Sequence, residues 1–200
     1  MTTTSKYHHG DLRRKLLETT TEMIQKGGLE AVSLRKIAEG AGVSRSAPYH
    51  HFKDKNDLLA AVAEQGFVTL TELLQKTIQR ESLPLTERLE QSILGYIRFA
   101  VEHPTQYELM FGSELWRKNP SDRLQRTAKD CFRQYADLIK AFYDDGALHK
   151  DEEPLRLAQL MWAALHGLVK LSHDGIVVRQ GDLEDISKYA MTQLSRMMKT

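Results

Sequence analysis

Hydrogen-bond donors are concentrated in the segment from residue 44 to residue 55. Arg45, Ser46 and Tyr49 follow Ser44 at the spacing of a short helix that presents them near its first turn. A guanidinium can donate to both O6 and N7 of guanine, a short hydroxyl permits close approach, and a tyrosine ring suits a thymine methyl. Donors near the N-terminus of a helix are typical of one that enters the major groove of DNA. These residue types therefore favour sequence-specific DNA binding, with all three as candidate base contacts.

Two lysines follow where the next helix is expected to begin. Lys53 and Lys55 flank a helix N-terminus, whose unpaired backbone N–H groups also attract phosphate. Together with His51 they are predicted to contact the DNA backbone. Ordinary solvated surface is the competing interpretation for any basic side chain, and it stays open for Ser46 and His51.

Three short helices are expected to position these residues. The first has Asp11 as N-cap, and the second is capped by Ser33. The third runs from Arg45 to about Phe52 behind an N-cap at Ser44. Two short helices separated by a glycine-containing turn indicate a helix-turn-helix. Pro48 would fall at the fourth position of the third helix and lacks an N–H, which leaves the start of that helix open.

The rest of the chain shows helical periodicity and no strand alternation. A long helix over about residues 54–77, capped by Asp54, is expected to join the first unit rigidly to the rest, and Ser82-Leu83-Pro84 ends it. The fold class is therefore predicted to be all-α with about nine helices. We expect a DNA-binding domain over residues 1–55 and a ligand-binding and dimerisation domain over 56–200.

The segment from Val32 to Lys55 resembles the DNA-binding domain of the TetR (tetracycline-repressor-like) family of bacterial transcription regulators. The resemblance covers roughly residues 7–65. It rests on the Ile-Ala-x-x-Ala-Gly-Val-Ser turn at 37–44, on Tyr-His-His-Phe at 49–52 and on Lys-x-Lys at 53–55. Further on, Tyr-Glu-Leu-Met-Phe at 107–111 and Trp-Ala-Ala-Leu-His-Gly at 162–167 resemble the Trp-His-Gly type of TetR C-terminal regulatory domain, and Tyr-His-His-Gly at 7–10 fits the same subgroup.

The resemblance implies further DNA contacts and a mode of action. It carries Arg35 over as a base or backbone contact and Ser33 as a phosphate contact, and it places His50 where the family often contacts a base. Solvated surface stays open for these three as well. Pro48 departs from the leucine usual at its position. The implied function is that of a transcriptional regulator, with repression favoured over activation, which binds a palindromic double-stranded operator as a homodimer and is released by a small-molecule effector.

The C-terminal part offers a dimer surface and a candidate effector pocket. Between Leu157 and Leu171 only Gln159, His166 and Lys170 are clearly polar, so the last two helices are predicted to pair with their symmetry mates in a four-helix bundle. Aromatic and apolar side chains suggest an apolar or aromatic effector, although core packing is the alternative for each one. The candidates are Tyr96, Phe99, Tyr107, Met110, Phe111, Phe132, Tyr135, Trp162 and His166.

The composition is that of a globular protein, and its charge is unevenly distributed along the chain. Of the 200 residues, 41% are hydrophobic and 28% charged, as in an ordinary globular protein. Residues 1–55 hold ten Lys or Arg against six Asp or Glu, a net +4, so the remainder carries −3 of the total +1. The start lacks the apolar run of a signal peptide and a single cysteine, Cys131, fits a reducing compartment, so we expect a cytoplasmic protein without a membrane span.

Catalysis and bound cofactors are not expected. The sequence contains no nucleophile elbow, phosphate-binding loop or metal-ligand spacing, and Cys131 lies on an apolar helical stripe that favours a buried position. We therefore predict no enzyme activity, no metal and no cofactor. The alternative from another class is an all-α ligand-binding protein or enzyme whose helix-turn-helix is vestigial, in which Arg45, Tyr49, Lys53 and Lys55 would be expected to have degenerated.

Overall fold

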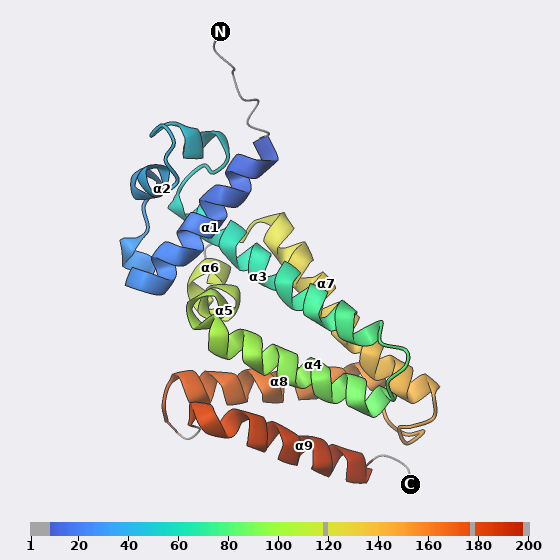
Figure 1. The fold of residues 1–200 in the computed structure, drawn as a ribbon. Coiled ribbons are helices and arrows are strands. Elements are labelled where there is room, and N and C mark those ends of the chain that lie inside the picture. The colour runs from blue at the N-terminus through green and yellow to red at the C-terminus, as the bar shows by residue number, and fades with distance from the viewer. Residues whose placement is uncertain (1–8, 118–119, 177–178, 198–200) are drawn as a thin grey trace. The chain divides into compact units, whose positions relative to one another are not determined.

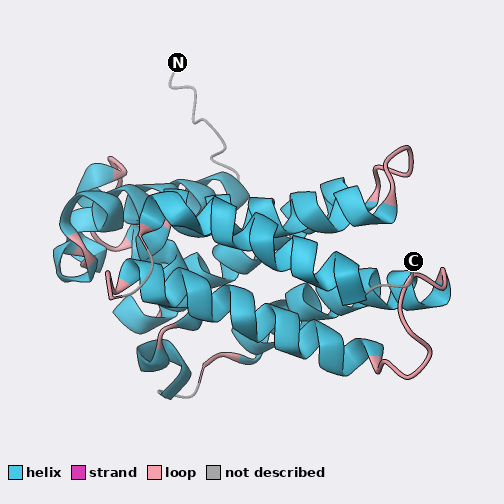
Figure 2. Ribbon diagram, turned by 90° about the horizontal axis from the view of Figure 1, so that it is seen from below, coloured by secondary structure: helices cyan, strands magenta, loops and turns pink. Residues whose placement is uncertain are grey.

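The computed structural model describes residues 9–117, 120–176 and 179–197. Within these ranges the chain is helical, without strands, and loops join the helices (Figures 1 and 2). The prediction of an all-α fold is confirmed. The elements are α1 (His9–Gly27), η1 (Leu29–Ala31), α2 (Leu34–Gly40), η2 (Ala47–His50), α3 (Lys55–Ile78), α4 (Leu85–Glu102), α5 (Pro104–Phe111), α6 (Ser113–Arg117), α7 (Asp122–Asp144), α8 (Pro154–His173), η3 (Gln180–Asp182) and α9 (Leu183–Met197), where η marks a 3-10 helix.

The chain divides into two compact units. Unit 1 comprises residues 1–66 and 105–125, and unit 2 comprises residues 67–104 and 126–200. Helices α3 and α7 therefore each contribute residues to both units. The functional division predicted at residue 55 concerns which residues contact DNA, and it stays a prediction.

In unit 1, α1, α2 and η2 enclose a small apolar core. α1 packs against η1 and α2, and α2 packs against η2. Leu16, Ile37 and Ala38 have no exposed surface, and Phe52 is 2% exposed. Burial of a leucine, isoleucine or phenylalanine side chain contributes about 1.5 to 3 kcal/mol, so these few residues hold the unit together. Val43, in the turn after α2, is half-buried.

Of the predicted helix caps, those at Ser33 and Asp54 agree with the structure, and that at Asp11 does not. The Ser33 hydroxyl oxygen accepts from the Lys36 N–H at 3.2 Å, which caps α2 as predicted. The Asp54 carboxylate accepts from the Asp57 N–H at 2.9 Å at the start of α3. The expectation for Asp11 was wrong, because α1 already begins at His9. Asp11 lies in the first turn of α1 and pairs instead with Arg14 at 2.6 Å.

In unit 2, α4 packs against α8 and α9. The turn that leads into α4 is fixed by Arg88, which donates from three guanidinium nitrogens to three backbone carbonyl oxygens. The acceptors are Leu83 at 2.9 Å, Glu81 at 3.0 Å and Ile78 at 3.2 Å. The bond to Ile78 O satisfies a carbonyl at the end of α3, and the other two hold the turn itself. The break predicted at residues 82–84 is thus a turn tied to both helices.

Gly66 lies within α3 where a larger residue would overlap a neighbour. A Cβ there would collide with Met110 Sδ and lie 3.2 Å from Gln106 Cγ. Met110 has no exposed surface, so the sulfur cannot swing into solvent. We expect Gly66→Ala to lower the free energy of unfolding by about 1 kcal/mol, because overpacking of about 1 to 3 kcal/mol exceeds the gain of about 1 kcal/mol in helix propensity. Gly95→Ala in α4, where a Cβ meets nothing within 4 Å, is the control and should stabilise the protein in the same urea titration.

Candidate nucleic-acid interface

The predicted recognition helix is shorter and tighter than the sequence suggested. Instead of an α-helix from Arg45 to about Phe52, the structure has the 3-10 helix η2 over Ala47–His50. Its first N–H groups bond at three-residue spacing, from Ala47 to Ser44 O at 3.0 Å and from Tyr49 to Ser46 O at 3.1 Å. Pro48 is the physical reason, since it has no N–H to donate and its fixed φ suits a first turn.

The N-cap assignment changes with the helix start. Ser46, not Ser44, is the N-cap residue of η2, and it forms no side-chain cap hydrogen bond. The Ser44 hydroxyl lies 3.2 Å from the Ser46 hydroxyl instead. The turn between α2 and η2 is held by Val43, whose N–H donates to Ala38 O at 2.9 Å. Gly42 in this turn has a φ of 66°, a left-handed conformation that favours glycine.

Four of the five predicted base contacts lie exposed on this one segment. Arg45, Ser46, Tyr49 and His50 face solvent, and the Tyr49 side chain is 60% exposed. Pro48 and Phe52 are buried beneath them at a spacing of four residues. The Phe52 N–H also donates to Pro48 O at 2.9 Å. Two buried anchors therefore fix the backbone, and the polar side chains between and before them project outward.

The other predicted DNA contacts lie in α2 and at the start of α3. Arg35, the fifth base contact, is exposed on α2, which packs directly against η2. Ser33 is half-buried, and its cap bond uses only an acceptor lone pair, so its O–H is still able to donate to phosphate. His51 is half-buried and Lys53 is exposed. The structure brings these residues into one unit, where their contacts with DNA remain predictions.

Lys55 has a structural role that the sequence did not show. Its ammonium donates to the backbone oxygen of Leu29 at 2.8 Å, which ties the start of α3 to η1. An ammonium has three N–H donors, so two remain for a phosphate. The sequence also indicated no role for Arg13, whose guanidinium carbon lies 5.5 Å from the Phe52 ring centroid. Both contacts join residues far apart in sequence, and local patterns give no signal for them.

The predicted effector-pocket residues are divided between the two units. Tyr96, Phe132 and Tyr135 surround Trp162 in unit 2, with ring centroids 5.4, 5.6 and 5.3 Å from it. Phe99, also in unit 2, lies beside His103 at 5.3 Å, and His166 is half-buried on α8. The remaining three candidates belong to unit 1, where Tyr107 and Phe111 are 4.7 Å apart and Met110 O accepts from Trp116 Nε1 at 2.7 Å.

Tyr135 stands out in the cluster around Trp162. It is 2% exposed, and its hydroxyl has no hydrogen-bond partner in the described part of the chain. Burial raises the pKa of this phenol well above its ordinary value, so the hydroxyl stays protonated. A buried hydroxyl without a partner costs about 1 to 3 kcal/mol.

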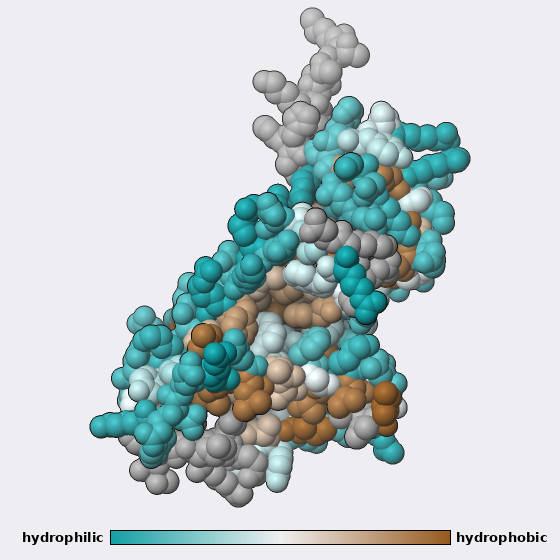
Figure 3. All heavy atoms as spheres, turned by 180° about the vertical axis from the view of Figure 1, so that it is seen from behind, coloured by the Kyte–Doolittle hydropathy of each residue, from teal (hydrophilic) through white to brown (hydrophobic). Residues whose placement is uncertain are grey.

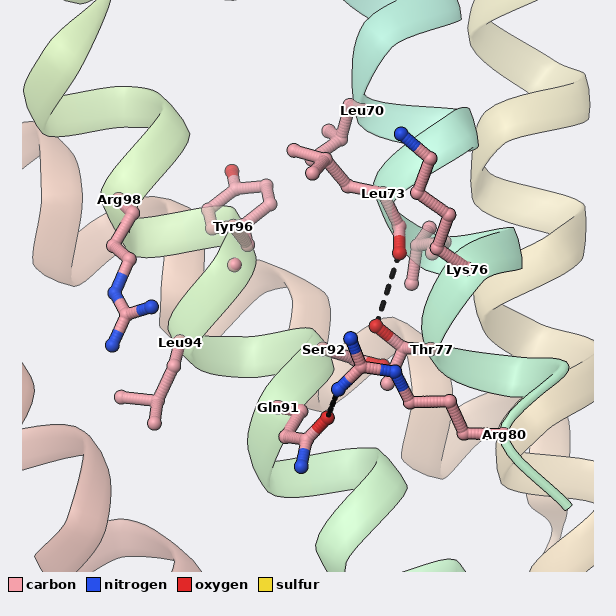
Figure 4. A pocket seen from close by; sticks show the side chains of 12 residues that line it. Leu70, Leu73, Lys76, Thr77, Arg80, Gln91, Ser92, Leu94, Tyr96 and Arg98 are labelled. Carbon is pink, nitrogen blue, oxygen red and sulfur yellow. Dashed lines mark hydrogen bonds between the residues drawn. The ribbon is translucent and has the colours of Figure 1, made fainter. Parts of the chain in front are cut away.

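A groove lies between α3 and α4 in unit 2 (Figure 4). It encloses about 440 Å³, within the range of about 300 to 1,000 Å³ found for small-molecule sites. Among the predicted pocket residues only Tyr96 contributes to its wall. The residues that line it are Leu70, Leu73, Leu74, Lys76, Thr77, Arg80, Gln91, Ser92, Leu94, Gly95, Tyr96 and Arg98.

Comparison with known families decides the assignment. A model described as bacterial regulatory proteins of the tetR family matches residues 16–62, which include α2, η2 and the start of α3. A second model, described as a tetracyclin repressor-like C-terminal domain, matches residues 89–194, more than half of the chain. The chain belongs to the TetR family. The two C-terminal motifs at 107–111 and 162–167 lie inside the second match, so the family predicted from the motifs is confirmed.

Relatives of this TetR-family regulator are named as regulators of transcription. PksA of Bacillus subtilis, a helix-turn-helix transcriptional regulator, is 26% identical over 161 residues, which cover 80% of this chain and 78% of PksA. The transcriptional repressor KstR2 of Mycolicibacterium smegmatis is 25% identical over 142 residues, 70% of this chain and 68% of KstR2. A solved structure of a Rhodococcus protein of unknown function superposes with a TM-score of 0.83 at 26% identity, over 98% of this chain and 100% of that one.

The described part of the TetR-family chain offers neither a membrane-spanning helix nor a cluster of metal ligands. Of the helices that the structure describes, none has the length and apolar character needed to cross a bilayer. Across the described residues, His, Cys, Asp and Glu side chains do not gather in threes as a metal site would require. The prediction of no metal and no cofactor stays a prediction.

Cys131 is buried in the regulator, as the apolar stripe predicted. It is 0% exposed, and burial raises the pKa of its thiol from 9.0 to about 11, partly offset by a hydrogen bond with Thr71. The unfolded thiol ionises near pH 9 and the folded one near pH 11, so the free energy of unfolding should fall as the pH rises between these values. We expect a fall of about 2 kcal/mol relative to Cys131→Ala, measured by urea titration at pH 8 and pH 11. If the free energy of unfolding changed equally between pH 8 and pH 11 in the two proteins, this prediction would be contradicted.

Proposed function

We propose that this TetR-family chain is a repressor that binds a palindromic DNA operator as a homodimer and is released by a small-molecule effector. The observation that carries the proposal is the set of exposed donors on η2 and on the two residues before it. Arg45, Ser46, Tyr49 and His50 project from a segment whose backbone is anchored by buried Pro48 and Phe52. Fixed donors on a protruding turn suit base edges in the major groove, where the pattern of acceptors differs between base pairs.

Dimerisation is supported by an exposed apolar face on the last two long helices. On α8, Leu160 is 68% exposed and Leu171 is 38% exposed, and on α9 Tyr189 is 67% exposed. Ala163 and Ala164 lie exposed between the two leucines. Figure 3, seen from behind, shows hydrophobic side chains gathered in the lower part, where α8 lies. A contiguous apolar face of this kind is typical of an interface, and two copies would form a four-helix bundle.

The direction of regulation and the compartment follow from the same proposal. KstR2 is named a repressor, and steric blocking of a promoter requires no further surface on so small a chain. A protein that binds chromosomal DNA acts in the bacterial cytoplasm, which agrees with the location expected from the sequence. Residues 1–55 would contact DNA, and residues 56–200 would dimerise and hold the effector.

In vitro transcription tests the proposal. DNA selected by the protein is placed across the promoter of a template, and transcripts are counted with and without the full chain. We expect transcript yield to fall as operator occupancy rises, while a template with a scrambled operator is unaffected. Increased yield would identify an activator of the same fold. The absence of any selected DNA would favour the ligand-binding protein with a vestigial helix-turn-helix.

A further inference from the structure

The groove between α3 and α4 combines buried apolar residues with cationic side chains, of which Lys76 extends toward Leu70 and Arg98 lies beside Tyr96 (Figure 4). Leu70 and Tyr96 lie at one end in Figure 4, and Arg80 and Gln91 lie at the other, close to the turn between the helices. Leu70 is 1% exposed, Leu74 4% and Tyr96 4%, so these side chains are set into the core of unit 2. Arg80 crosses the groove and donates from Nη1 to the Gln91 side-chain oxygen at 2.8 Å.

The charge on the walls of the groove has one sign. Lys76, Arg80 and Arg98 line it, and none of the twelve lining residues is acidic. Arg98 lies 3.7 Å from Glu184 of α9, a long contact between two largely exposed groups. For Lys76 and Arg80 the structure shows no carboxylate partner among the described residues. Gln91 accepts from Arg80 through its oxygen, which leaves the amide NH₂ as a further donor at the same end.

We propose that this groove binds a small amphipathic anion, with an apolar chain directed to Leu70 and Tyr96 and a carboxylate or phosphate head at Arg80. This inference rests on the proposed function, since such a molecule would be the effector. It sharpens the sequence-based expectation of an apolar or aromatic effector, because every charged side chain that lines the groove is positive. A guanidinium next to an amide donor matches the geometry of a carboxylate or phosphate.

The groove is placed where occupancy acts on the helix that begins at the DNA-contact residues. α3 runs without interruption from Lys55, which follows the predicted phosphate contact Lys53, to Ile78. The turn after it is tied to α4 by Arg88, so the two helices are fixed together at that end. A ligand that separates α3 from α4 must therefore move one of the two helices and cannot simply open the turn. Because α3 is continuous from Lys55 to Ile78, any displacement of α3 at the groove acts on its start.

Calorimetric titration of the full-length protein tests the groove. The probes are decanoate, decyl phosphate, octanoate, the neutral decan-1-ol and acetate, all below their micellar concentrations. We expect one of the two ten-carbon anions to bind, with decan-1-ol and acetate at least about tenfold weaker. Because each buried methylene tightens binding about fourfold, octanoate, with two fewer, should bind about fifteenfold more weakly than decanoate if the carboxylate is the preferred head. Equal binding of decan-1-ol, or no binding of either anion, would overturn the inference.

Variants separate the groove from non-specific binding. Arg80→Gln should weaken the anion about tenfold and leave decan-1-ol unchanged, whereas Arg133→Gln on α7, outside the groove, should change neither. Leu94→Glu places a like charge in the wall and should abolish anion binding. Equal affinities for Arg80→Gln and the parent protein would refute the assignment of the head group.

DNA binding distinguishes this inference from the proposed function. All three variants should bind the selected operator as the parent protein does when no ligand is present. If the protein binds the operator but binds neither anion, only the assignment of the groove is wrong. If no specific DNA is bound at all, the proposed function is wrong. Release of operator DNA from the parent protein by the anion, and not from Arg80→Gln, would support both.

Discussion

Replacement of Arg45 by alanine should remove most of the preference for operator DNA over scrambled DNA. Each half-site loses a guanidinium contact of about 1 to 3 kcal/mol, so a dimer loses about 2 to 6 kcal/mol of discrimination. Arg45 is exposed at the start of the segment whose backbone is fixed by Pro48 and Phe52, so the substitution leaves the core intact. Fluorescence anisotropy with operator and scrambled duplexes measures both affinities at one salt concentration.

Lys53→Gln is the matched control for Arg45→Ala. Lys53 is exposed, and only its backbone N–H takes part in the fold, through a 2.9 Å bond to the Asp57 carboxylate. Loss of a phosphate contact should weaken binding to all sequences equally and reduce the salt slope by about one per contact. Lys55 is unsuitable, because its bond to Leu29 O would be lost as well. Unchanged discrimination in Arg45→Ala would show that the residue does not contact a base.

Leu160→Glu should convert the protein to monomers at micromolar concentration. The Leu160 side chain is 68% exposed in the single chain, so the substitution should leave the stability of the folded monomer unchanged. In a two-fold dimer the substitution occurs twice, and at roughly 2 kcal/mol per central contact the loss is about 4 kcal/mol, or about a thousandfold in the dissociation constant. Sedimentation velocity gives the result directly. Affinity for a palindromic operator should fall with it, since half-sites are then bound singly.

Gln75→Glu is the control for the added charge. Gln75 is exposed on α3, and its substitution adds one negative charge away from α8 and α9. This variant should remain dimeric. A dimeric Leu160→Glu protein would show that the dimer forms through another surface. A monomeric parent protein would contradict the proposed homodimer.

The long helices could be predicted closely from the sequence because local patterns determine them. The cap at Asp54 and the break at 82–84 anticipated α3, which runs from Lys55 to Ile78. η2 could not be predicted in the same way. Its 3-10 geometry depends on the missing N–H of Pro48 together with burial of Phe52, and only the second requires the tertiary fold.

The candidate site was only partly predictable. Residue types identified Arg45 and Tyr49 as donors, and the structure shows both exposed on one turn. The bond from Lys55 to Leu29 and the contact of Arg13 with Phe52 join distant segments, and no periodicity indicates them. The groove lies between two helices joined by a turn. Its polar lining becomes visible only when Arg80, in the turn after α3, is seen opposite Gln91 of α4.

Selection of bound duplexes from a random DNA pool by the full-length protein tests the central claim most directly. We expect enrichment of one palindromic sequence whose two half-sites are related by a two-fold axis. Two chains should bind each such sequence. We also expect that selection with Arg45→Ala loses specific bases from both half-sites at once. A pool that stays random after repeated rounds, or a selected site without two-fold symmetry, would contradict a dimeric operator-binding regulator.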